Sequence, residues 1–148
     1  MSLTKRFQAG DYLFRQGEKS GAMYVLLTGT LTVSARGETI ATVKDPGSFV
    51  GELSFLTGKP RSADVKAETE CKVLSVEDVE RFFKEDSRHA VAVAKEIARR
   101  LDSLNGKFLE MKRLARSPHV GEGTINEVVK VLCSDDEGDS TVVSSRLV

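Results

Sequence analysis

The sequence predicts a mainly β domain, of the sandwich, barrel or jelly-roll kind, followed by helices. Two observations indicate this. Eight of the twelve glycines lie within the first 58 residues, four to ten residues apart, which is typical of turns between short strands. No glycine then occurs between Gly58 and Gly106, and no proline between Pro60 and Pro118. Such an interval favours helix, because both residues interrupt helices.

The β-forming segments lie between these glycines and just after Pro60. One of them places Ala63, Val65 and Ala67 in alternation with polar or charged neighbours. This period of two is typical of half-buried antiparallel strands. The predicted strands are residues 5–8, 12–15, 23–28, 31–35, 39–44, 62–67 and 71–76.

Two helices are predicted after the strands. Ser75 is the candidate N-cap of a short helix whose apolar side chains are Val79, Phe82 and Phe83. Ser87 is the candidate N-cap of a longer helix, in which an apolar residue recurs at alternating steps of four and three. This seam consists of Ala90, Ala94, Ile97, Leu101, Leu104, Phe108, Met111 and Ala115.

Length and composition exclude several classes of protein. With 148 residues, 40% hydrophobic and 30% charged, the chain suffices for one globular domain and a short appendage. Lys plus Arg and Asp plus Glu both number 22, so net charge would attract neither nucleic acid nor an anionic membrane. The longest apolar run, residues 22–27, is too short to cross a bilayer, and the first residues lack the pattern of a secretory signal. We therefore expect a cytoplasmic protein.

The cysteines and histidines form no recognisable reactive pattern. Cys71 and Cys133 lie far apart without the neighbours that a zinc site or a disulfide framework would have, and Cys71 is expected to fill space in a strand. His89 and His119 have no cysteine, serine or carboxylate at a telling spacing, so both are expected at the surface. We therefore predict neither catalytic residues nor metal ligands.

Residues 46–63 carry the most informative pattern, since they place Glu52 and Arg61 in an otherwise apolar neighbourhood. Residues 52–56 can form one helical turn, whose free N–H groups favour an anion. Arg61 adds a planar guanidinium that can hold two oxygens of one phosphate. An ionised Glu52 only accepts hydrogen bonds, so beside a phosphate it would face a donor such as a sugar hydroxyl. Phosphate and hydroxyl together indicate a nucleotide. The alternative is a structural ion pair between Glu52 and Arg61 under a loop.

This stretch resembles the phosphate-binding cassette of cyclic nucleotide-binding domains, such as those of catabolite activator proteins and regulatory subunits of cAMP-dependent kinases. The resemblance rests on Gly-Glu-Leu at 51–53 and Arg-Ser-Ala at 61–63, and it extends over residues 5–116. It implies a double-stranded β-helix (jelly roll) over residues 5–76 and helices over 77–116. Residues 117–148 are expected to be a loosely ordered extension with an acidic tail.

The resemblance also implies roles for individual residues. The glutamate matching Glu52 takes the ribose 2′-hydroxyl, and the arginine matching Arg61 pairs with the cyclic phosphate. In the family, a serine or alanine at the position of Ser62 accompanies a preference for cAMP, so cAMP is the expected ligand and cGMP the alternative. The backbone amides that would complete the anion cradle lie around Gly51, Leu53, Ser62 and Ala63.

The base side of the site is expected to lie between the roll and the long helix. Val33 and Ala41 would provide an apolar wall, and the helix positions that contact the purine match Leu104 and Asn105. Members that bind DNA add a helix-turn-helix after the long helix. Here residues 117–148 offer one short predicted helix at 124–133, so we expect no direct DNA binding.

These expectations describe a non-catalytic regulatory module that senses a cyclic purine nucleotide by moving its C-terminal helix. We also expect a homodimer through the long helix, because its apolar seam exceeds what one small roll needs; the alternative is packing on its own domain. A second hypothesis is a ligand-free module for dimerisation or docking. A phosphodiesterase would need paired carboxylates or histidines to hold metals, which the sequence lacks.

Overall fold

The computed structural model describes residues 2–19, 21–116, 123, 126, 127 and 130. Most of the predicted extension, including most of the helix at 124–133 and the acidic tail, lies outside the described residues, as do Cys133 and His119. The chain divides into two compact units, with the boundary between Ala90 and Val91. The first unit contains every strand described below, and the second contains most of the long helix.

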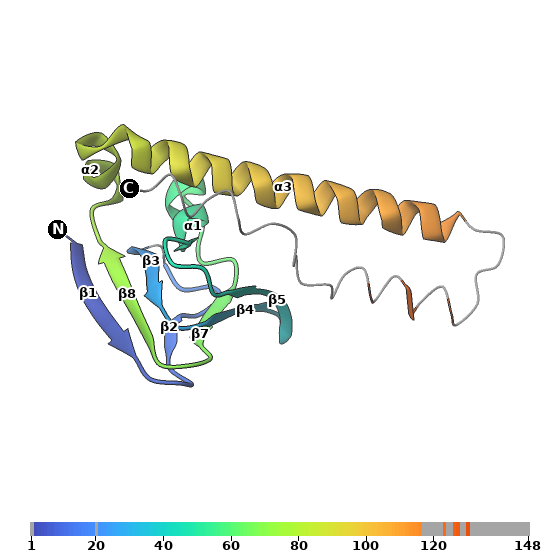
Figure 1. Ribbon diagram of the computed structural model, residues 1–148, viewed down its shortest axis with the longest axis horizontal. Coiled ribbons are helices and arrows are strands. Elements are labelled where there is room, and N and C mark those ends of the chain that lie inside the picture. Colours follow the sequence, from blue (N-terminus) through green and yellow to red (C-terminus); the bar gives the residue numbers. More distant parts are fainter. Residues whose placement is uncertain (1, 20, 117–122, 124–125, 128–129, 131–148) are drawn as a thin grey trace. The chain divides into compact units, whose positions relative to one another are not determined.

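The described strands form two four-stranded antiparallel sheets, which confirms the predicted fold class (Figure 1). The first sheet has the order β1 (Ser2–Phe7), β8 (Cys71–Val76), β3 (Met23–Thr28) and β6 (Phe49–Val50). The second has the order β2 (Tyr12–Phe14), β7 (Asp64–Ala67), β4 (Leu31–Ala35) and β5 (Glu38–Val43).

Each predicted strand is present; β3, β4 and β8 have the predicted bounds, and the ends of the other four are shifted. The first begins at Ser2 rather than at residue 5, because β1 pairs with β8 along its whole length, from Ser2 opposite Val76 to Phe7 opposite Cys71. Strand β6 was not predicted, since two residues are too short to show alternation. Seven of the eight glycines assigned to turns have positive φ, namely Gly10, Gly17, Gly29, Gly37, Gly47, Gly51 and Gly58.

The hydrophobic core is built from side chains of both sheets. Leu26 and Val73 enter it from the first sheet, and Leu31 and Val65 from the second. Cys71 is also part of this cluster, which confirms its expected role as a small apolar filler. The core holds the two sheets together and so fixes the loops that join them.

Three helices are described: α1 (Glu52–Thr57), α2 (Val79–Glu85) and α3 (Ser87–Ala115). The N-cap predicted for α2, Ser75, is wrong, because β8 continues past it and buries it in the sheet. Asp78 caps α2 instead: its side chain accepts a hydrogen bond from the Arg81 backbone N–H at 2.9 Å. A carboxylate suits this place, since it also complements the positive end of the helix dipole.

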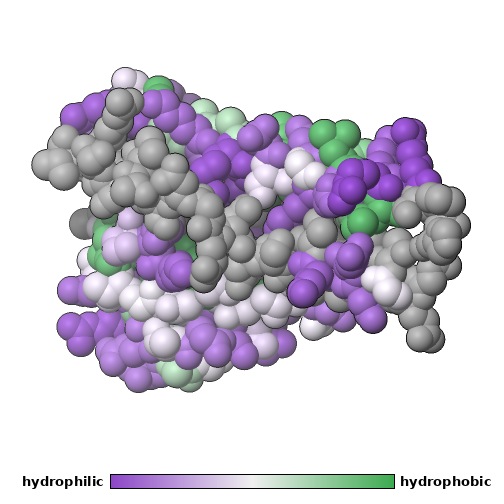
Figure 2. Space-filling view, turned by 45° about the vertical axis from the view of Figure 1, so that its right-hand side comes forward, coloured by the Kyte–Doolittle hydropathy of each residue, from purple (hydrophilic) through white to green (hydrophobic). Residues whose placement is uncertain are grey.

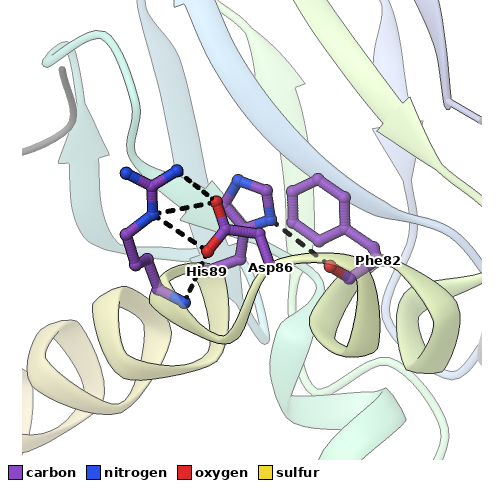
Figure 3. A network of polar contacts seen from close by, with 4 residues as sticks. Phe82, Asp86 and His89 are labelled. Carbon is purple, nitrogen blue, oxygen red and sulfur yellow. Dashed lines mark hydrogen bonds and ion pairs between the residues drawn. The ribbon is translucent and has the colours of Figure 1, made fainter.

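The N-cap predicted for α3, Ser87, is likewise replaced by its neighbour. The Asp86 carboxylate accepts a hydrogen bond from the Arg88 backbone N–H at 2.9 Å (Figure 3). The Asp86 carbonyl oxygen accepts one from the His89 backbone N–H at 3.0 Å. Ser87 becomes the first residue of the helix. One acidic residue therefore both ends α2 and begins α3.

Helix α3 is continuous over 29 residues, with Gly106 in its interior. Three large side chains of its apolar seam are exposed, with relative accessibilities of 57% for Leu101, 63% for Leu104 and 56% for Phe108. Along the top of Figure 2, where α3 runs, apolar side chains lie among hydrophilic ones. Among the described residues, no helix combines the length and apolarity needed to cross a membrane.

Candidate functional site

Gly51 joins β6 to α1 in a conformation that other residues rarely adopt. Its φ is +88° and its ψ is 0°. A Cβ atom at this position would lie 2.6 Å from Nη1 of Arg61, 3.2 Å from the carbonyl oxygen of Ala22 and 3.3 Å from the ring of Phe14. Both backbone conformation and space therefore require glycine here. Because no side chain intervenes, Arg61 can approach the first turn of α1.

Arg61 is buried, with 4% of its surface exposed, and its guanidinium makes three hydrogen bonds. Nη1 donates to the Gly51 carbonyl oxygen at 2.8 Å and to Ser54 Oγ at 3.0 Å. Nη2 donates to the Ala22 carbonyl oxygen at 2.5 Å. The guanidinium carbon also lies 4.2 Å from the centre of the Phe14 ring, a cation–π contact. The side chain is therefore held in one orientation.

The acceptors of these three bonds are neutral oxygens. The interactions that hold Arg61 therefore differ from the structural ion pair that the sequence left open. Burial lowers the pKa of Arg61, and electrostatic interactions with Tyr24, Glu18 and Glu52 oppose this shift. An arginine remains protonated at neutral pH after such shifts. The site thus contains a buried, oriented cation whose charge an anion could neutralise.

The connection between β2 and β3 lies against Arg61 through its backbone. Gly17 N–H donates to the Arg61 carbonyl oxygen at 2.9 Å, and Arg61 N–H donates to the Glu18 carbonyl oxygen at 2.8 Å. Together with the bond to Ala22, these contacts attach both ends of this connection to one residue. A change in the position of Arg61 must therefore be accommodated by this loop.

The structure brings some of the predicted phosphate and ribose residues together. Glu52 begins α1, is almost fully buried and contributes to the electrostatic environment of Arg61, beside Gly51. Leu53 and Ser62 are exposed, on α1 and just after Arg61 respectively. Ala63 is buried immediately before β7.

The predicted apolar wall is a row of paired residues across the second sheet. Val33 on β4 lies directly opposite Ala41 on β5 and opposite Val65 on β7. Val65 in turn lies opposite Phe14 on β2. Directly opposed residues of antiparallel strands project to the same face, so the four side chains share one face. Since Phe14 contacts the Arg61 guanidinium, this apolar row extends from Arg61 toward Val33 and Ala41.

The predicted purine contacts Leu104 and Asn105 lie on α3 within the second unit, and both are exposed. Their role at the base stays a prediction. Sequence reasoning missed Phe14, Ala22 and Ser54, which all contact Arg61. Phe14 and Ala22 are far from Arg61 along the chain, so no local spacing could reveal them.

A chain of aromatic contacts leads from α1 to the beginning of α3 within the first unit. The rings of Phe55 on α1 and Phe83 on α2 meet edge-on at 6.2 Å, and Phe83 is 6.1 Å from Phe82. Phe82 stacks on His89 at 4.1 Å with an angle of 4° between the rings. His89 Nδ1 lies 3.3 Å from the Phe82 carbonyl oxygen (Figure 3). His89, which was expected at the surface, is therefore half-buried and packed against Phe82.

Asp86, at the same junction, is bound by its neighbour Arg88. Nε and Nη2 of Arg88 donate to the Asp86 carboxylate at distances between 2.6 and 3.0 Å. The Arg88 side chain, and then its backbone N–H, hold the pKa of Asp86 down at about 2. The carboxylate therefore stays ionised as a helix cap. In the described part of the chain, no three His, Cys, Asp or Glu side chains are grouped so that they could hold a metal ion.

Comparison with known proteins assigns the family. The model of the family described as "Cyclic nucleotide-binding domain" matches residues 4–86. The potassium/sodium hyperpolarization-activated cyclic nucleotide-gated channel 3 of Rattus norvegicus is 35% identical over 127 residues, which cover 82% of this chain and 16% of the channel.

Two solved structures extend the similarity to kinase regulatory subunits. The regulatory subunit of a cAMP-independent protein kinase A from Trypanosoma brucei aligns with a TM-score of 0.57 and 28% identity, over 66% of this chain and 35% of that one. The regulatory domain of Toxoplasma gondii PKA, crystallised with cAMP, aligns with a TM-score of 0.54 and 26% identity, over 66% and 39%. With the two-sheet fold and the segment around Glu52 and Arg61, these matches show that the chain belongs to the cyclic nucleotide-binding domain family.

Proposed function

We propose that this chain is a non-catalytic regulatory module that binds a cyclic purine nucleotide, with cAMP preferred over cGMP. The observation that carries the proposal is the buried guanidinium of Arg61, held beside Gly51 and near the charge of Glu52. The related kinase regulatory structures include one described as cAMP-independent and one crystallised with cAMP. Family membership alone therefore does not identify the ligand. The assignment of the ligand depends on the residues of this site.

In the proposed complex, Arg61 binds the cyclic phosphate and Glu52 accepts a hydrogen bond from the ribose 2′-hydroxyl. A charge-assisted bond made in this buried setting is stronger than the same bond at an exposed surface. Backbone amides around Gly51, Leu53, Ser62 and Ala63 add further donors. The purine would lie along Val33 and Ala41, whose row begins beneath Arg61.

In the proposed mechanism, the aromatic contacts transmit the effect of nucleotide binding from the site to α3. A phosphate that draws α1 toward itself displaces Phe55, which packs against Phe83. Phe83 contacts Phe82, and Phe82 stacks on His89 in the first turns of α3. The nucleotide would favour one position of α3 only to the extent that it binds that position more tightly. In the favoured position, Leu104 and Asn105 would approach the base.

The proposed domain spans residues 5–116 and acts as a homodimer. Exposure of Leu101, Leu104 and Phe108 supports an interface along α3, because large apolar side chains that share one face of a helix tend to be covered. The proposal includes no contact with DNA. A ligand-free docking module is less consistent with the site, since such a module would have no need to keep Glu52 and Arg61 buried together.

Competition for a fluorescent cyclic nucleotide tests this function. The competitors are cAMP, cGMP, cyclic dinucleotides and 5′-AMP, which keeps the base and sugar of cAMP but opens the phosphate ring. We expect cAMP to compete best and 5′-AMP at least tenfold less well, a difference of ~1.4 kcal/mol. Failure of every cyclic nucleotide to compete would overturn the proposal.

The same assay tests ligand preference. Ser62 follows Arg61 and is exposed, so Ser62→Thr adds a methyl group without disturbing the core. Because the added methyl group restricts rotation of the hydroxyl that Ser62 already carries, we expect this substitution to move the cAMP to cGMP affinity ratio toward cGMP by roughly fivefold, or ~1 kcal/mol. A wild-type protein that binds cGMP several-fold more tightly would reverse the assignment of the ligand.

A further inference from the structure

The guanidinium of Arg61 has N–H donors that its hydrogen bonds within the protein do not use. Arginine carries five N–H donors, and the three hydrogen bonds described above use both of those on Nη1 and one on Nη2. Nε–H and the second Nη2–H have no acceptor among the described residues. Two donors on one planar group can bind two oxygens of a phosphate. The internal bonds thus leave enough donors for a ligand.

Two side chains determine how these donors are directed. Phe14 lies under the face of the guanidinium, and its own ring stacks on Tyr24, with ring centres 6.0 Å apart and an angle of 23°. Ser54 is buried on α1, and its hydroxyl accepts from Nη1 of Arg61 while lying 3.5 Å from the Gly51 carbonyl oxygen. Phe14 therefore fixes the plane of the guanidinium, and Ser54 limits its rotation within that plane.

The geometry points to Phe14 and Ser54 as positioning residues of the nucleotide site, which orient Arg61 before the phosphate arrives. This inference rests on the proposed function. Neither side chain needs to touch the ligand. An arginine that is already ordered loses less side-chain entropy on binding than one that must first be ordered, so the orientation contributes to affinity. It also determines which phosphate oxygens the guanidinium meets.

The main test is Ser54→Ala, matched by Thr57→Ala on the same helix. Both variants remove a hydroxyl from α1, and alanine forms helix well, so α1 is expected to remain folded. Thr57 donates its hydroxyl to the Leu53 carbonyl oxygen at 2.6 Å and does not contact Arg61. Phe14→Leu is a second variant, which keeps an apolar side chain but removes the aromatic face. Thermal unfolding of each variant shows whether it is folded.

Two readouts separate positioning from a structural role. The first is the affinity for cAMP, which we expect to fall about fivefold to tenfold in Ser54→Ala and Phe14→Leu and to stay unchanged in Thr57→Ala. The second is the affinity ratio of the two phosphorothioate diastereomers of cAMP, in which sulfur replaces one or the other exocyclic oxygen. An oriented guanidinium distinguishes these oxygens, so we expect the ratio to approach one when the orientation is lost.

The outcomes distinguish this inference from the function on which it rests. A wild-type protein that binds no cyclic nucleotide overturns the proposed function. A wild type that binds, with Ser54→Ala and Phe14→Leu matching it in both affinity and diastereomer ratio, overturns the positioning role alone. A loss in Thr57→Ala as large as that in Ser54→Ala would also overturn it, because the effect would then belong to the helix.

Discussion

The ring of Phe55 on α1 meets the ring of Phe83 on α2 edge-on, with centroids 6.2 Å apart and an angle of 73° between the planes. Helix α1 begins with Glu52, so this contact connects the candidate site to the next helix. Both residues belong to the first compact unit. A displacement of α1 therefore has a direct physical route to α2, and from there to His89.

Replacing Phe83 by alanine should uncouple nucleotide binding from α3. The ring contact is worth ~0.5–1.5 kcal/mol beyond its buried area, so its loss should reduce the coupling by up to about tenfold. The measurement is the change in the NMR signals of His89 on addition of cAMP, which we expect to shrink in Phe83→Ala. Leu56→Ala, at an exposed position of α1, is the control. A His89 response as large as that of the wild type would exclude this route.

Gly51→Ala should damage both stability and binding. The positive φ and a Cβ atom 2.6 Å from Arg61 Nη1 would cost ~1–3 kcal/mol and displace the guanidinium. Gly106→Ala is the matched change in the interior of α3, where a Cβ meets nothing within 4 Å, and it should stabilise by ~0.5–1 kcal/mol. Urea unfolding of both variants measures these effects. Wild-type stability of Gly51→Ala would show that the site does not require glycine.

The carboxyl group of Asp86 should titrate at about 2 in the folded protein, because the side chain and backbone of Arg88 bind its ionised form. An unfolded aspartate titrates near ~3.9, so the folded pKa is the lower one. This stabilisation is therefore complete above the unfolded pKa and is lost as the pH falls toward 2. Carboxyl NMR titration of the wild type and of Arg88→Gln measures the pKa of Asp86. The pKa should rise in the variant, and an unchanged value would contradict the assignment to Arg88.

Several elements of the fold could be predicted because their signals are local. Turn glycines mark the strand ends, and the fixed spacing from Gly51 to Arg61 identifies the site, which the structure brings together. The cap of α2 could not be placed, because whether Ser75 ends a strand or begins a helix depends on its pairing with β1 and β3.

The surroundings of Arg61 could not be predicted for a related reason. Ala22 and Phe14 reach it only because the two sheets and their loops fold together. Ser54 is close in sequence, yet a serine three residues into a helix has no distinctive pattern. The residues that orient a charge are thus less visible in a sequence than the charge itself.

Helix α3 should mediate a two-fold symmetric homodimer. The exposed seam residues Leu104 and Phe108 are the proposed centre of the interface. Sedimentation should give a dimer for the wild type and a monomer for the Leu104→Glu, Phe108→Glu double variant, because carboxylates in an apolar interface would be desolvated and repelled. A wild-type monomer at micromolar concentration, with and without nucleotide, would rule the dimer out.

The most direct measurement is calorimetric titration of cAMP into the wild type and Arg61→Lys. A lysine is a point charge that can neither hold two oxygens nor keep the contacts of a guanidinium with Phe14, Gly51 and Ala22. We expect the wild type to bind one cAMP per chain and the variant, shown to be folded by circular dichroism, to bind at least tenfold more weakly, a loss of ~1.4 kcal/mol. Equal affinities for the two proteins would remove Arg61 from the site and contradict the proposed mode of binding.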